Sequence, residues 1–195
     1  MQRARMPETW RTERLRATAL SEAHLGDLCA LHQDPEVMRH LSVDGRSLSD
    51  EETRAGLEAA MGHWQEHGFG LWAFHDLHSG EFVGRAGLKW YDLPGLDGRR
   101  EVGLAYAVPS RFWQRGFATE MASGALSVGF GAGGLPAVGS WTLPGNIPSQ
   151  RVMEKLGFRY QTDFEFAGLP HRYYRLEPGG FSPQRVGDPN PSVPG

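Results

Sequence analysis

A glycine-containing loop between a strand-like and a helix-like segment offers the most specific chemistry in this sequence. The strand-like run 101–108 stops before Pro109, and the helix-like run ends at Phe130. Between them lie Trp113, Gln114, Arg115, Gly116, Phe117, Ala118 and Thr119. A helix start presents free backbone N–H groups and the positive end of the helix dipole, which together attract anions. Arg115 adds a cation that suits phosphate, so the loop predicts a site for a phosphorylated cofactor.

Alternating strand and helix patterns predict the elements that must position this loop. Strands are expected at residues 15–20, 69–74, 82–90, 101–108, 137–143, 158–166 and 171–176. Helices are expected at about 21–34, 49–66, 118–130 and 147–156. This order combines antiparallel hairpins with one right-handed parallel crossover. We therefore expect an α/β (α+β) fold, a single domain whose twisted, mixed and mostly antiparallel sheet has about seven strands flanked by about four helices.

Length and composition describe one ordinary globular domain. The chain has 195 residues, 39% of them hydrophobic, with a net charge of −3 and a sequence pI near 6.2. This charge disfavours a nucleic-acid partner, and no apolar run reaches the roughly 20 residues that span a bilayer. The single cysteine, Cys29, fits a reducing compartment, so we expect a cytoplasmic protein without a membrane partner. We expect a flexible leader at 1–10, the folded domain at 11–177 and a disordered tail at 178–195.

Three separated groups of residues together resemble one family. The first is the strand 101–108 with the loop 113–118, and the second is Asn146-Ile147-Pro148-Ser149 followed by residues 151–158. The third joins residues 13–16 with residues 34–39. The combination resembles the GNAT superfamily of acyl-CoA-dependent N-acyltransferases, in particular the branch that includes ribosomal-protein N-terminal acetyltransferases. Trp113 and Ala118 fit the loop of that branch, whereas Gln114 replaces its second glycine.

The resemblance implies how acetyl-CoA would be held. The backbone N–H groups of residues 113–119 would bind the pyrophosphate, and a backbone donor at about Val108 would polarise the thioester carbonyl as an oxyanion hole does. The sheet would splay at its central parallel strand pair, so that the pantetheine arm lies between the two strands. Asn146 would cap its helix, alone or together with a contact to the cofactor. No metal ion is expected.

Glu101 and Ser149 are the candidate catalytic residues. Glu101 would take a proton from the incoming amine, directly or through water; the alternative is a solvated glutamate at a strand end. Many family members carry a tyrosine acid on the helix that corresponds to 147–156, and this chain has none there. Ser149 would then assist the departing thiolate, unless it is only a first-turn serine. Trp90 and His171 are expected to contact the acceptor; the alternatives are a core aromatic residue and a surface histidine.

The expected function is acetyl-CoA-dependent N-acetylation of a primary amine by direct attack in a ternary complex. A free α-amine has a pKa of about 8, so roughly a tenth of it is neutral at pH 7, which favours a protein N-terminus over a lysine. The alternatives are a small amine (a polyamine, an amino acid or an antibiotic) and a non-catalytic acyl-CoA-binding module. A homodimer is a further expectation, because flat exposed strands in this fold often pair.

Overall fold

A mixed sheet forms the centre of the molecule. The computed structural model describes residues 5–42 and 44–183. Its eight strands lie in the order β1-β2-β3-β4-β5-β6-β8-β7, and every neighbouring pair is antiparallel except β5 and β6. They are β1 (Thr9–Arg11), β2 (Leu15–Ala19), β3 (Leu71–Asp76), β4 (Phe82–Leu93), β5 (Arg99–Ala107), β6 (Val138–Thr142), β7 (Arg159–Phe166) and β8 (Leu169–Leu176). The expected α/β fold with a mostly antiparallel sheet is confirmed.

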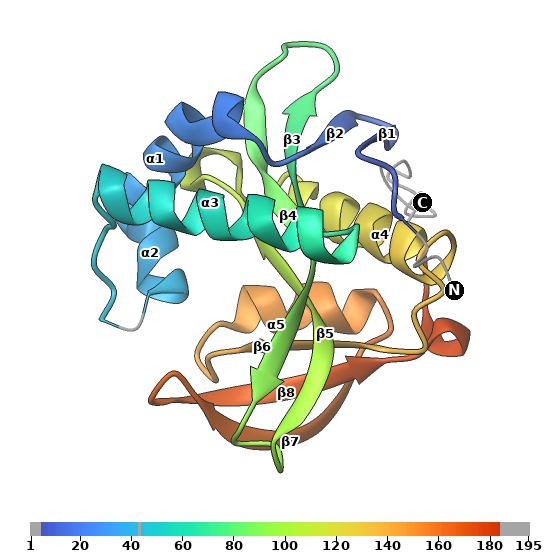
Figure 1. The fold of residues 1–195 in the computed structure, drawn as a ribbon. Helices are drawn as coiled ribbons and strands as arrows, with labels where there is room; N and C mark the ends of the chain where they lie inside the picture. The colour runs from blue at the N-terminus through green and yellow to red at the C-terminus, as the bar shows by residue number, and fades with distance from the viewer. Residues whose placement is uncertain (1–4, 43, 184–195) are drawn as a thin grey trace, which may run out of the picture.

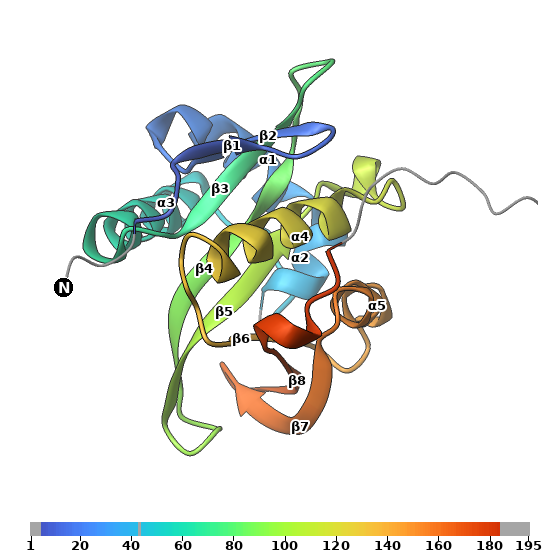
Figure 2. The same ribbon diagram turned by 90° about the vertical axis from the view of Figure 1, so that its right-hand side faces the viewer.

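The helices lie on both faces of this sheet. The described residues contain α1 (Leu25–Gln33), α2 (Pro35–Leu41), α3 (Asp50–His67), α4 (Phe117–Phe130) and α5 (Ile147–Lys155). In Figure 1, α3 crosses in front of the sheet, whereas α4 and α5 lie behind it, and the side view in Figure 2 separates the two layers. None of the helices in the described ranges is both long and apolar enough to cross a membrane.

Alternate residues of β5 face two separate cores. Val102 and Leu104 join the larger core together with residues of α4 and α5. Ala105 and Ala107 instead pack into a second core that residues of α1, α2 and α3 complete. This alternation is the two-residue period of a strand. It places the side chain of Tyr106 on the α4 and α5 side and fixes the direction of every other residue along the strand.

Two elements were not expected from the sequence. Thr9 and Trp10, which fall in the expected leader, belong to the edge strand β1. The short helix α2 begins at Pro35, where the sequence indicated only the end of the preceding helix. Asp34 caps α2 by accepting a hydrogen bond from the N–H of Glu36 at 3.1 Å. Proline suits this position because the first turn of a helix leaves its N–H groups without an intrahelical partner.

The chain beyond β8 stays on the domain up to Ser182. Pro178–Gly180 forms a 3-10 turn, and the ring of Phe181 lies 5.6 Å from that of Phe130. The N–H of Ser182 donates to the carbonyl of Leu156 at 3.1 Å. The first residues of the expected tail are therefore attached to the fold, and residues 184–195 lie outside the described ranges.

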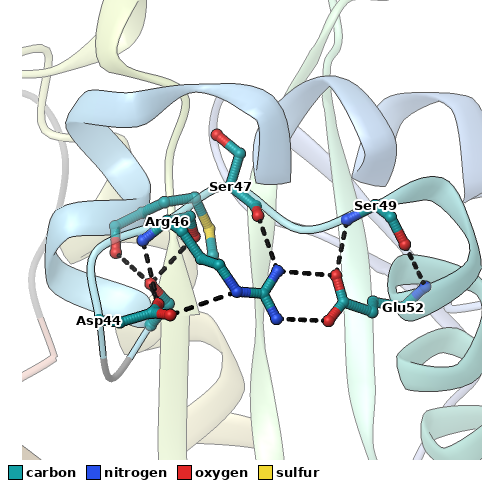
Figure 3. Close-up of polar contacts among 7 residues, drawn as sticks. Asp44, Arg46, Ser47, Ser49 and Glu52 are labelled. Carbon is teal, nitrogen blue, oxygen red and sulfur yellow. Dashed lines mark hydrogen bonds and ion pairs between the residues drawn. The ribbon is translucent and has the colours of Figure 1, made fainter.

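One exposed arginine organises the loop between α2 and α3, as Figure 3 shows. Arg46 makes two parallel hydrogen bonds to the Glu52 carboxylate, at 2.5 and 2.9 Å, and an ion pair with Asp44 at 3.2 Å. Glu52 also forms the expected capping box with Ser49 at the start of α3. The hydrogen bond from Arg46 is the main cause that lowers the pKa of Glu52 to about 2.

Candidate active site

The central parallel strands separate almost at once, so the expected splay is confirmed. In the described ranges, β5 and β6 pair through Gly103 and Gly139 alone. A Cβ on Gly139 would lie 2.7 Å from a carboxylate oxygen of Glu101, and one on Gly103 would lie 2.8 Å from the Trp141 ring. Glycine is therefore what lets the strands approach at this single point. Beyond it, Ser140 Oγ donates to the carbonyl of Leu104 at 3.2 Å and fills part of the gap.

The predicted anion loop does connect β5 to the start of a helix. Gly116 is the N-cap of α4 with a φ of 78°, and Gln114 also has a positive φ of 63°. No side chain in the described residues caps α4. The first N–H groups of the helix therefore keep their donor capacity at the positive end of the dipole. Exposure decreases along the loop: Trp113, Gln114, Arg115 and Gly116 are exposed, Ala118 and Thr119 are half-buried, and Phe117 is buried.

A buried charge pair supports this loop from the N-terminal hairpin. The Glu120 side chain, only 3% exposed, accepts hydrogen bonds from the N–H and the Nε of Arg14, at 2.9 and 2.7 Å. The Nη1 of Arg14 donates to the carbonyl of Arg115 at 3.0 Å, and its guanidinium lies 4.5 Å from the centre of the Phe117 ring. Arg14 thus neutralises a carboxylate that would otherwise repel an anion at the start of α4. The sequence analysis assigned no role to either residue.

Trp113 fastens the loop to the end of β5. Its indole N–H donates to the carbonyl of Val108 at 2.8 Å. Val108 is buried and follows the last residue of β5 directly. The guanidinium groups of Arg111 and Arg115 lie 4.6 and 5.5 Å from the centre of the Phe112 ring. Trp113 therefore fixes the start of the loop, and the loop holds cations beside the α4 terminus.

Ser149 meets a tyrosine that the sequence analysis did not select. Asn146 caps α5 as expected, by accepting a hydrogen bond from the N–H of Ser149 at 3.3 Å. The hydroxyl of Tyr106, from β5, lies 2.8 Å from Ser149 Oγ and 3.1 Å from the Ser149 carbonyl oxygen. Burial raises the pKa of Tyr106, so the phenol keeps its proton. A phenol and an alcohol are therefore adjacent, although α5 itself carries no tyrosine.

Glu101 is a buried carboxylate with two partners from β8. It is 8% exposed; its Oε1 accepts from Arg175 Nε at 3.0 Å, and its Oε2 accepts from the Tyr173 hydroxyl. Burial and then the hydrogen bond to Glu101 raise the pKa of Tyr173 to about 12. The hydrogen bond to Glu101 also raises the pKa of Arg175. Glu101 is therefore not the solvated strand-end residue of the alternative interpretation, since it is buried and both of its oxygens accept hydrogen bonds from β8.

A cavity of about 530 Å³ lies at Glu101. Its lining consists of Trp90, Arg99, Arg100, Glu101, Val102, Leu135, Pro136, Ala137, Gln161 and Arg175. The structure thus brings Trp90 and Glu101 together. His171 is apart from this lining: it is half-buried at the start of β8, with its ring 5.7 Å from Phe166 and 6.2 Å from Phe164. The anion loop lies at the opposite end of β5 from Glu101.

Histidines four residues apart on α3 have structural partners. His63 Nδ1 lies 2.8 Å from the carbonyl oxygen of Phe69, and His63 Nε2 accepts from the N–H of Trp90 at 3.0 Å. The His63 and His67 rings are 4.5 Å apart. Across the described residues, no three side chains of the metal-ligating types converge.

Comparisons with known proteins agree with this geometry. The family model described as "Acetyltransferase (GNAT) domain" matches residues 14–159, which include the loop, Glu101 and Ser149. The curated Bacillus subtilis (strain 168) protein named uncharacterized N-acetyltransferase YoaA is 26% identical over 148 residues, which cover 76% of this chain and 81% of that protein.

Solved structures show the same architecture. A GNAT-family acetyltransferase from Bordetella pertussis superposes with a TM-score of 0.74 at 27% identity, covering 87% of this chain and 99% of the other. RimL, a ribosomal α-N-protein acetyltransferase in complex with coenzyme A, superposes with a TM-score of 0.69 at 15% identity over 88% and 97% of the two chains, a likeness of fold. With its family match, its splayed β5 and β6 and its uncapped α4, this chain belongs to the GNAT family of acetyltransferases.

Proposed function

We propose that this protein transfers an acetyl group from acetyl-CoA to a primary α-amine by direct attack in a ternary complex. One observation carries the proposal: a single strand, β5, connects a buried carboxylate at Glu101 with an uncapped helix start at Gly116, and it separates from β6 in between. The anion site at one end of the strand gap suits the phosphates of a coenzyme A thioester. The base at the other end suits the amine acceptor.

The loop residues fit the diphosphate of coenzyme A. The N–H groups of residues 113–119 would donate to its oxygens, and Arg115 would add a cation. Arg14 supports this arrangement, because it cancels the charge of Glu120 where an anion would approach. The N–H of Val108 would polarise the thioester carbonyl. Asn146 would border the bound cofactor. Acetyl-CoA would supply the activated thioester, and backbone and side-chain groups of this chain would do the rest.

Glu101 is proposed as the general base. A carboxylate oxygen has two lone pairs, so Oε1 and Oε2 can each accept a further hydrogen bond beside those from Arg175 and Tyr173. We propose that a water bound there carries the proton from the amine to Glu101. The task is modest for an α-amine, of which roughly a tenth is neutral at pH 7.

Ser149 and Tyr106 are proposed to assist the leaving thiolate. The Tyr106 hydroxyl is close enough to donate to Ser149 Oγ, which would orient the serine hydroxyl hydrogen toward the thiolate sulfur. Both hydroxyls would keep their own protons, so the pair would stabilise the thiolate by a hydrogen bond, and the thiolate would take its proton from water. A tyrosine from β5 would thus support the helix on which other family members carry their tyrosine.

The acceptor class follows from the modest base and from the neighbouring structures. RimL is described as acting on a protein α-amine, which supports an α-amine for this chain. A terminal peptide amine and a free amino acid both carry this group. Trp90 lines the cavity at Glu101, and His171 would lie further along the path of the acceptor. The pI near 6.2 gives no reason to expect nucleic acid as a partner.

Two measurements test the proposal. Acetyl-CoA at about 100 times its Kd should stabilise the fold by about 2.7 kcal/mol, seen as a higher Tm. Thiol release should follow when α-amines are added, and lysine side-chain analogues should react much more slowly at pH 7. Stabilisation without thiol release from any amine would support the non-catalytic alternative, and the absence of both would contradict the proposal.

A further inference from the structure

Two cations lie in one row on the face of β4. Arg85, Lys89 and Tyr91 are separated by even numbers of residues, so their side chains project to the same side of the strand. The Lys89 ammonium lies 5.2 Å from the centre of the Tyr91 ring. Tyr91 is directly opposite Glu101 in the β4–β5 ladder, and Lys89 is opposite Gly103. The row therefore leads along the sheet to the candidate base.

The other end of the row reaches the helical layer in front of the sheet. Arg85 pairs with Ala73 on one side and with Ala107 on the other, and both alanines belong to the core that α1, α2 and α3 complete. The charge of Arg85 contributes, after burial, to lowering the pKa of His32 on α1 to about 4. In Figure 1 this is the face that α3 crosses, opposite α4 and α5.

Neither cation has an acidic partner in the part of the chain that the structure describes. The ion pairs found there involve two histidines and other arginines, among them Arg14, Arg46 and Arg175, and none involves Arg85 or Lys89. Both side chains are half-buried, and burial lowers the pKa of each. Arg85 lowers the pKa of Lys89 further, because the two positive charges repel.

Such an arrangement is unfavourable for the protein on its own. A cation that loses water and gains no carboxylate costs stability, and a second cation nearby adds repulsion. A hydrophobic or amide side chain would serve the packing better. The charges are therefore best explained by an anion that arrives with a ligand.

We propose that Arg85 and Lys89 bind an anionic group of the acceptor, so that the preferred substrate is an α-amine carrying a carboxylate near the reacting nitrogen. This inference rests on the proposed function for the identity of the reacting group. Lys89 lies two residues along the sheet from the Tyr91–Glu101 pair, a Cα separation of about 7 Å. A carboxylate at Lys89 and an amine directed at Glu101 are thus spaced as in an amino acid or an acidic dipeptide. Polyamines are disfavoured, because they would meet like charge.

Binding of matched ligands tests the inference separately from turnover. Calorimetry with saturating coenzyme A would compare Ala-Asp amide with Ala-Asn amide, which have the same shape and differ by one negative charge. We expect at least about 10-fold tighter binding of the acidic ligand at low salt. The pair alanine and alaninamide shows in the same way whether a free amino acid supplies the carboxylate.

The double variant Arg85→Gln, Lys89→Gln should reduce the ratio between acidic and neutral ligands to about 2-fold or less. Arg16→Gln removes an exposed arginine on β2 and should leave the ratio unchanged. A thermal melt and coenzyme A binding establish that each variant folds.

Equal binding of the two ligands by the unmodified protein, absence of binding by both, or a ratio that survives in the double variant would each overturn the inference. Thiol release in the same samples reports on the proposed function separately. If thiol is released but acidic and neutral ligands bind equally, the protein is an acetyltransferase that lacks this specificity. If the acidic ligand binds more tightly but no thiol is released, the anion site exists and the proposed reaction is wrong.

Discussion

Two arginines of this molecule differ in burial and in the partners of their charge. Arg46, in the loop between α2 and α3, is exposed, yet it bonds both oxygens of Glu52 and pairs with Asp44 (Figure 3). Arg85, on β4, is half-buried and close to Lys89, and the described residues provide no carboxylate for it. The protein thus pairs the charge of Arg46, which water could have solvated, and leaves the charge of Arg85, which water reaches poorly, without a carboxylate among the described residues.

This difference separates a structural role from a binding role. Arg46 connects Asp44 with the capping-box residue Glu52, a task that needs its partners within the chain. Arg85 has no carboxylate partner among the described residues, and we infer that its charge serves a ligand. Glu101 combines features of both arginines. It is buried and has partners within the chain, but its oxygens can still accept further hydrogen bonds from a ligand or water.

The largest expected effect comes from Glu101→Gln. The amide keeps the shape but cannot take a proton, so we expect kcat to fall about 100-fold at pH 7, with part of the loss recovered at high pH where more amine is neutral. Thiol release at saturating acetyl-CoA over a pH series measures this. Glu52→Gln is the matched control, a carboxylate equally bound to an arginine but outside the site, and it should keep full kcat. Equal activity of Glu101→Gln and the unmodified protein would remove Glu101 from the mechanism.

Glu120→Gln should have the next largest effect, on stability and on cofactor binding together. It leaves Arg14, 32% exposed, without its buried carboxylate, and we expect a loss of about 2 kcal/mol in the free energy of unfolding. Because Arg14 also holds the Arg115 carbonyl, coenzyme A should bind more weakly. Urea unfolding and calorimetry measure the two quantities. Tighter coenzyme A binding would mean that Arg14, freed from Glu120, acts on the ligand directly.

Substitution of the two compared arginines should change stability in opposite directions. Arg85→Gln removes a poorly solvated charge and should raise the free energy of unfolding by about 1 kcal/mol, whereas Arg46→Gln should lower the Tm slightly. The Arg46 contribution depends on pH. Since the folded pKa of Glu52 is about 2 and its ordinary value is 4.5, the contribution is full above pH 4.5 and disappears as the pH falls toward 2. Destabilisation by Arg85→Gln would assign that arginine a structural role.

The elements that carry the candidate site could be predicted because their signals are local. Gly116 precedes a helix, Asn146 caps one, and Ser49 with Glu52 forms a capping box, each within a few residues. Periodicity located most strands for the same reason. The start of α2 was missed because proline both ends and begins helices, and β1 because three residues are too few for a pattern.

The partners of the site residues depend on register, which the sequence does not determine. Tyr173 and Arg175 reach Glu101 from β8, more than 70 residues away, and only the strand order brings them there. Tyr106 meets Ser149 across a separation of 43 residues. One signal was available: Arg85 and Lys89 are the charged residues of the run 82–91 and lie four residues apart, which indicates two cations on one face of a strand.

The smallest expected effect is a shift in the pKa of His32, which reports directly on the charge at Arg85. His32 has its pKa lowered to about 4 by burial and by Arg85, so the folded protein keeps this imidazole neutral while the unfolded chain protonates near 6.5. Stability therefore falls as the pH decreases from 6.5 toward 4. A carboxylate bound at Arg85 would offset its charge and raise the pKa of His32, and Arg85→Gln should raise it as well. Proton NMR of the His32 ring measures both shifts, with His78 as an exposed reference. If Ala-Asp amide leaves the His32 pKa unchanged while it binds, the anion lies elsewhere, and the contrast between Arg46 and Arg85 has another cause.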